Sequence, residues 1–256
     1  MKDNKIKILT TTYNSGKYFD LCMNSILSQK YNNFIWCIID DCSIDNTFDK
    51  IPNKKNIIKM RNNIHNGGAL PNLHNMYLNY CESDDISIVC DGDDWLVNKN
   101  VLSYINDFYN KYNCMMMYGQ CRWYNPESQF KRFEEKGLAY PISQEQFKNL
   151  RNSLSWPFSH IRTFRAKAYH EIEKQDPNYD CLKDENGKMY TIGAGDFAVF
   201  LPVAEIVGYE NIKYNDKVLY VYNRETKLNE DKVYSFDLQT KNHLEVNSKP
   251  KFKQIF

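Results

Sequence analysis

The sequence lacks a long apolar run and an excess of charge of either sign. None of its apolar stretches approaches the roughly 20 residues that a transmembrane helix requires. The first seven residues lead directly into a strand-like run and lack the apolar centre of a signal peptide. The net charge is +1 over 256 residues, so electrostatics favour neither nucleic acid nor an anionic membrane as a partner. We therefore expect a cytoplasmic protein with no transmembrane segment and no nucleic-acid partner.

Closely spaced cysteine pairs are also absent, because none of the eight cysteines belongs to a CxxC pair. Cys37 and Cys90 lie inside apolar strand-like runs, and Cys22 lies on the apolar face of a helical pattern. Small buried thiols in a reducing compartment are therefore favoured over a disulfide framework.

Apolar runs of strand length alternate with helical patterns along the first 110 residues or so. Strands are expected at 6–13, 34–39, 56–60 and 86–90, and this alternation predicts an α/β fold with a mostly parallel central sheet flanked by helices. The later half predicts strands at 114–119, 156–165 and 218–222, a surface excursion at 122–136, and helices at 166–172 and after residue 196. The sequence leaves open whether the tail from residue 236 packs on the core, mediates an oligomer or frays.

The run Ile86–Cys90 ends in a cluster of carboxylates, Asp91, Asp93 and Asp94. Ligands of open α/β sheets bind at the carboxyl ends of the strands. Two carboxylates about 6 Å apart repel by roughly 3 kcal/mol at an effective dielectric near 20, and Mg²⁺ or Mn²⁺ would relieve that repulsion. A solvated Asp-Gly turn is the alternative.

Polar side chains also follow the first two strands. Thr11 and Asp41 can hydrogen bond to a pyrimidine ring, and Tyr13 offers a stacking face. Asn66 and Gly67 precede a helix, where the backbone can approach phosphate, although a simple turn explains them equally well.

Five blocks occur in the order seen in family 2 glycosyltransferases, which the chain resembles over about residues 5–110. They are Thr11–Asn14, Ser25–Gln29, Ile39–Thr47, Asn66–Gly68 and Asp91–Asp94. The resemblance implies a GT-A fold, with 1–235 as one domain, 1–112 its nucleotide-sugar-binding half, 113–235 its acceptor-binding half and 236–256 a tail.

The resemblance also implies roles for individual residues. Thr11, Tyr13 and Asp41 would hold the nucleotide base, and Asp93 would face the ribose and sugar. Asp94 would ligate the metal that bridges the diphosphate. Asp91 would contact ribose or only shape the turn.

Two further groups of candidates lie in the second half. His160 and Arg162 would share one face of the expected strand at 156–165. There Arg162 could neutralise phosphate, and His160 could bind metal or acceptor. The alternative is that both residues lie at a sheet edge and have no function in the site. Asp196 opens an apolar helix, so it is either a helix cap or, as the resemblance implies, the catalytic base. The family usually has Glu-Asp at this place, and here Gly195 stands in for the glutamate.

Together these features predict an inverting, metal-dependent glycosyltransferase of the hexosyl- or N-acetylhexosaminyl-transferase class. It would use Mn²⁺ or Mg²⁺ and a nucleotide-diphosphate sugar, most simply a UDP-sugar. Its acceptor would be a hydroxyl of a glycan, a protein or a small molecule. Two rivals are a nucleotidyltransferase, for which the loop after the first strand has too few glycines, and a catalytically silent nucleotide-sugar-binding module.

Overall fold

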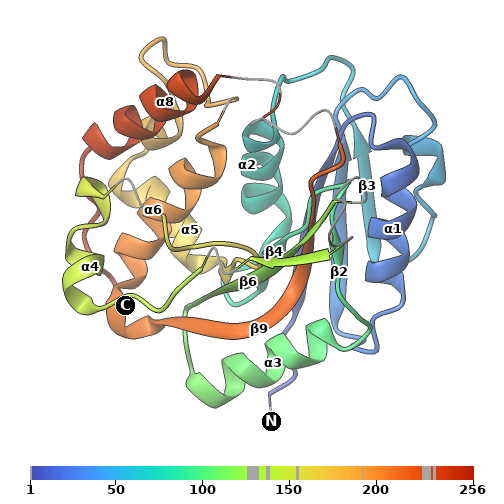
Figure 1. Ribbon diagram of the computed structural model, residues 1–256, viewed down its shortest axis with the longest axis horizontal. Coiled ribbons are helices and arrows are strands. Elements are labelled where there is room, and N and C mark those ends of the chain that lie inside the picture. The colour runs from blue at the N-terminus through green and yellow to red at the C-terminus, as the bar shows by residue number, and fades with distance from the viewer. Residues whose placement is uncertain are drawn as a thin grey trace.

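The computed structural model describes residues 2–125, 133–136, 139–153, 156–191, 193–226, 232 and 235–256 (Figure 1). Its strands are β1 (Ile6–Thr12), β2 (Phe34–Asp40), β3 (Ile57–Arg61), β4 (Ile86–Val89), β5 (Trp95–Leu96), β6 (Met116–Tyr124), β7 (Phe133–Lys136), β8 (Thr163–Arg165) and β9 (Ile212–Asn223). Its α-helices are α1 (Gly16–Leu27), α2 (Ala69–Tyr80), α3 (Val101–Tyr112), α4 (Gln144–Lys148), α5 (Lys167–Gln175), α6 (Gly195–Val207) and α8 (Phe236–Ser248). Short 3₁₀ helices are η1 (Phe48–Lys50), η2 (Leu150–Asn152), η3 (Asp180–Leu182) and η4 (Tyr209–Asn211).

One sheet runs through the described part of the chain, in the order β3-β2-β1-β4-β8-β6-β9-β5, with β7 beside β6. The first four strands in this order are parallel, as the alternation of strands and helices predicts. β8 joins the sheet antiparallel to both β4 and β6, and β6 is parallel to β9. The α/β prediction is confirmed, and strands from both halves of the chain belong to the same sheet.

The sheet is covered on both faces, which explains why its parallel strands are apolar almost throughout. Ile6 and Ile8 of β1 pack with the buried residues of α1 and α3. Leu9, which points to the opposite face, packs with α2, α5 and α6. α6 is buried from Phe197 to Val207, since it lies among the sheet, α5 and α8 (Figure 1).

Two expectations for the second half are wrong. The strand predicted at 156–165 is confined to Thr163–Arg165. The predicted surface excursion at 122–136 instead continues β6 to Tyr124 and then forms β7. The sheet register places Arg122 opposite Glu135, so this charged segment contains paired strands of the sheet.

All eight cysteines are free thiols, and seven of them are buried. Among the described residues, no helix is both long and apolar enough to cross a membrane.

Candidate active site

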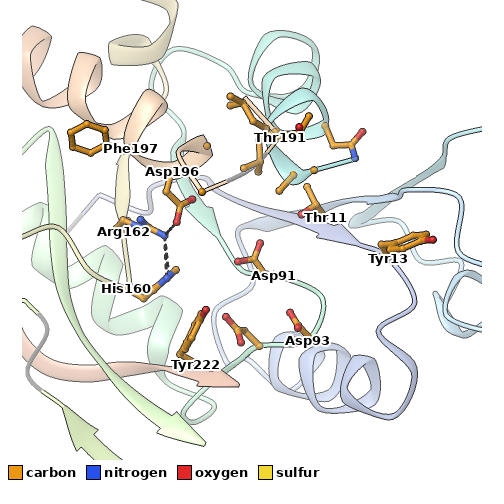
Figure 2. Close-up of a pocket in the computed structure, with 18 of the residues that line it drawn as sticks. Thr11, Tyr13, Asp91, Asp93, His160, Arg162, Thr191, Asp196, Phe197 and Tyr222 are labelled. Carbon is orange, nitrogen blue, oxygen red and sulfur yellow. Dashed lines mark hydrogen bonds and ion pairs between the residues drawn. The ribbon is translucent and has the colours of Figure 1, made fainter. Parts of the chain in front are cut away.

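A cavity of about 730 Å³ opens at the carboxyl ends of β1, β2 and β4 and extends to the start of α6. This volume is typical of a small-molecule site. Ten of the eleven site residues predicted from the sequence line it: Thr11, Tyr13, Asp41, Gly67, Asp91, Asp93, Asp94, His160, Arg162 and Asp196. Figure 2 shows the Asp91 and Asp93 carboxylates on one side and Asp196 on the other. Asn66 is not among the lining residues, but its backbone N–H donates to the Asp41 carboxylate.

The loop of residues 91–94, which carries Asp91, Asp93 and Asp94 and is called the acidic loop below, lies close to the end of β1. The Gly92 backbone N–H donates to the Thr11 carbonyl at 3.0 Å. A Cβ at position 92 would lie 2.4 Å from Thr12 Oγ1, so only glycine fits. This close approach brings Asp91 and Asp93 beside Thr11.

Both carboxylate oxygens of Asp94 have protein partners. The Tyr220 hydroxyl donates to Oδ2 and the Asn223 backbone N–H to Oδ1, each at 2.7 Å. The side chain is buried, and burial, with the charges of Asp93 and Asp91, raises its pKa well above the ordinary value. Asp94 therefore fastens the acidic loop to β9.

The donor set suits a hard divalent cation only in part. Asp91 and Asp93 present carboxylate oxygens to the cavity, and burial raises the pKa of Asp93 to about 6. Yet the described residues contain no group of three His, Cys, Asp or Glu side chains arranged to hold a metal. A cation at this loop would need further ligands from the donor molecule.

The predicted base pocket is partly filled by the imidazole of His65. Its ring stacks on Tyr13, with centroids 3.9 Å apart and planes 16° apart, and its Nδ1 lies 2.7 Å from Asp41 Oδ2. The Asp41 carboxylate also accepts hydrogen bonds from the Asn66 backbone N–H at 3.1 Å and from Asn62 Nδ2 at 2.6 Å. Two of the three side chains predicted to hold a base, Tyr13 and Asp41, thus already contact a flat nitrogen heterocycle of the protein itself.

Asp196 lies in the first turn of α6 and forms an ion pair with Arg162. The helix is capped by Ala194, without a side-chain hydrogen bond, so Asp196 is not the N-cap residue. Enclosure acts to raise the pKa of Asp196, but the Arg162 guanidinium beside it holds that pKa below the ordinary value. With 49% of its side chain exposed, the ionised carboxylate can reach a ligand in the cavity.

Arg162 and His160 form the support behind this carboxylate (Figure 2). Arg162 is buried, and its Nη2 lies 3.1 Å from His160 Nε2. The His160 ring stacks on Tyr220 at 4.8 Å and on Tyr222 at 5.5 Å between centroids. Burial, together with the charge of Arg162, lowers the pKa of His160 to about 3, so the ring is neutral at physiological pH.

Several residues of the lining carry no signal in the sequence that points to a site. They are His65, Trp156, Thr191, Tyr222 and His243. His65 sits next to the predicted Asn66–Gly67 turn, and Trp156 begins the segment predicted as a strand. His243 belongs to a polar tail whose position depends wholly on tertiary packing.

The sheet order and the acid-lined cavity at its carboxyl edge define a GT-A type α/β domain. The family model of glycosyl transferase family 2 matches residues 7–173, and the chain belongs to that family. Chondroitin synthase of Pasteurella multocida is 24% identical over 243 residues, which are 94% of this chain and 22% of that protein. The chain thus spans about a fifth of that relative's length.

Two solved structures share the fold at low sequence identity. Staphylococcus aureus TarS 1-349 in complex with UDP-GlcNAc aligns with a TM-score of 0.64 and 18% identity, over 90% of this chain and 61% of that one. The mannosyltransferase PcManGT from Pyrobaculum calidifontis, in complex with GDP-Man and Mn²⁺, aligns with a TM-score of 0.53 and 13% identity, over 88% and 58%.

Proposed function

We propose that the chain transfers a sugar from a nucleotide-diphosphate donor, a UDP-sugar, to an acceptor hydroxyl with inversion. One observation carries the proposal: a single cavity joins the Asp91 and Asp93 carboxylates at the end of β4 to the ionised Asp196 at the start of α6. The first pair lies where a nucleotide diphosphate binds in an α/β sheet. Asp196 is proposed to act on the opposite side of the transferred sugar.

Asp196 is the proposed catalytic base. The acceptor oxygen forms a bond to the anomeric carbon, the bond from that carbon to the diphosphate oxygen breaks, and the acceptor proton passes to the Asp196 carboxylate. The nucleoside diphosphate leaves with the bonding electron pair. Arg162 keeps the carboxylate ionised and oriented before the acceptor arrives.

Asp93 and Asp91 are the proposed metal-binding carboxylates, since Asp94 is engaged with Tyr220 and Asn223. A bound Mn²⁺ or Mg²⁺ would stabilise negative charge on the leaving diphosphate. Thr11, Tyr13 and Asp41 are proposed to hold the base once His65 has moved from Tyr13. His160, neutral and stacked on two tyrosines, is proposed to position Arg162 rather than to bind metal.

Nucleotide binding and turnover can be measured separately. A thermal-shift screen of UDP, GDP and their sugars, with and without Mn²⁺, should give the largest stabilisation with UDP or a UDP-sugar plus Mn²⁺. Release of UDP from the stabilising donor then reports hydrolysis or transfer. Binding without any release, with every acceptor tested, would instead identify a silent nucleotide-sugar-binding module, for which Gly195 in place of the family's glutamate is the supporting observation.

A further inference from the structure

The C-terminal segment is fastened to the domain by a buried ion pair. Arg151 pairs with Glu205 of α6 through Nε and Oε1 at 2.6 Å. Arg151 Nη1 also donates to the carbonyls of Val246 at 3.0 Å and Lys249 at 2.7 Å. The Phe252 backbone N–H donates to Glu205 Oε2 at 3.0 Å. The end of α8 and the residues after it are therefore held against α6.

The start of α8 packs on the loop that leads to Asp196. A Cβ placed on Gly193 would lie 2.6 Å from Gln239 Cγ, so the helix and the loop backbone are in direct contact. Figure 1 shows α8 beside α6 at the side of the molecule away from α1. This packing gives α8 a fixed position relative to the site.

His243 of α8 reaches into the cavity next to the proposed base. Its ring stacks on Phe197 with centroids 4.8 Å apart and planes 29° apart. It makes a hydrogen bond to the Gly193 backbone, and burial lowers its pKa despite an attraction to Asp196. A neutral imidazole that donates one N–H to a carbonyl has its second nitrogen left as an acceptor.

Aromatic side chains extend this wall of the cavity. Trp156 packs edge to face against Phe197, with centroids 4.5 Å apart, and against Phe158 at 4.8 Å. The indole Nε1 of Trp156 is buried without a hydrogen-bond partner among the described residues. Aromatic faces carry partial negative charge and suit the C–H face of a pyranose ring, and the indole N–H can donate to a sugar oxygen.

We propose that α8 forms the acceptor subsite, in which His243 accepts a hydrogen bond from the hydroxyl adjacent to the one that Asp196 deprotonates. The acceptor is accordingly a sugar with two adjacent hydroxyls. This inference rests on the proposed glycosyl transfer. His243 contacts the acceptor directly, and its proposed contribution to the reaction is to acceptor binding.

The test separates the ring of His243 from its nitrogens. His243→Phe keeps an aromatic ring on Phe197 and removes the acceptor nitrogen. Leu244→Ala changes the neighbouring exposed side chain, 53% accessible, and serves as the control. Saturation-transfer NMR of the wild-type protein with UDP and Mn²⁺ would use three probes, the methyl β-glycosides of glucose, galactose and N-acetylglucosamine.

We expect the wild-type protein to bind at least one probe, and His243→Phe to bind it about tenfold more weakly, as loss of one hydrogen bond predicts. Leu244→Ala should match the wild type, and all three proteins should bind UDP within about twofold. The inference is overturned if His243→Phe binds the probe as tightly as the wild type does, or if Leu244→Ala loses as much probe affinity as His243→Phe. It is also overturned if the wild type binds none of the three probes. Absence of UDP binding in the wild type would instead count against the proposed function itself.

Discussion

At the residue scale, the contacts of Asp196 decide what its substitution tests. The sequence left a cap and a base as alternatives, and a cap would have survived replacement by asparagine. In the structure the side chain instead balances the charge of buried Arg162. A buried cation that loses its anionic partner destabilises the fold.

Asp196→Asn should therefore bind UDP and Mn²⁺ normally, lose transfer by at least about 10²-fold and melt at a lower temperature. Because the pKa of Asp196 is lowered in the fold, its stabilising charge is present above about pH 4 and is lost as pH falls through the lowered value. The melting difference from wild type should thus be constant from pH 6 to 8 and shrink only below about pH 4. Asp237→Asn, in the first turn of α8, is the control, and transfer by Asp196→Asn near the wild-type rate would remove the base assignment.

The acidic loop gives a second pair of substitutions with opposite expectations. The Tyr220 hydroxyl and the Asn223 N–H each donate to one carboxylate oxygen of Asp94. In Asp94→Asn only one acceptor oxygen remains for these two donors, so the melting temperature should fall. Asp93→Asn should leave the melting temperature near that of the wild type and weaken Mn²⁺-dependent UDP binding at least tenfold. Calorimetry measures the UDP affinity of both variants with and without Mn²⁺, and thermal melts measure their stability. If Asp94→Asn loses the Mn²⁺ dependence of UDP binding while its melting temperature is unchanged, Asp94 is the metal ligand.

At the scale of elements, the contact between α8 and the loop before α6 depends on one glycine. Gly193 has φ +64°, and its Cβ position lies 3.1 Å from Gln239 Cα. Any larger residue must therefore displace backbone as well as adopt a left-handed conformation. The acceptor subsite proposed on α8 should be sensitive to that displacement.

Gly193→Ala should lower the melting temperature by more than Gly187→Ala does. Gly187 also has a positive φ, +75°, yet nothing lies within 4 Å of its Cβ position, so it measures the conformational strain alone. Hydrogen exchange at the amides of α8 should rise in Gly193→Ala and not in Gly187→Ala. Equal melting temperatures for the two variants would show that the close approach of Gln239 contributes nothing.

At the scale of the whole molecule, the pair Arg151–Glu205 joins three segments that are distant in the sequence. Glu205 of α6 is buried, and its carboxylate contacts Arg151 from one segment and the Phe252 backbone N–H from another.

Glu205→Gln should lower the free energy of unfolding by about 3–5 kcal/mol, the range for one lost partner of a buried ion pair. The exposed Glu210→Gln in η4 should change it by less than about 0.5 kcal/mol. Faster cleavage by trypsin at Lys251 or Lys253 would report release of the C-terminal segment. An unchanged denaturation midpoint with unchanged cleavage would show that the pair is not what holds this segment.

The sequence by itself determined the first half of the molecule. Continuous apolar runs of strand length alternate there with helical patterns of period 3.6, and parallel strands bring their carboxyl ends to one edge. Thr11, Tyr13, Asp41 and the acidic loop were therefore placed together from local patterns alone. The order of the motifs also pointed to glycosyl transferase family 2.

Only the tertiary structure decided which role each of these residues can have in the site. Whether a carboxylate is free or engaged depends on partners that lie far away in the chain, such as Tyr220 for Asp94 and Arg162 for Asp196. The polar helix α8 has no local pattern that fixes its place. Its position follows from a buried ion pair and a close backbone approach between segments more than 40 residues apart, and neither contact has a local signal in the sequence.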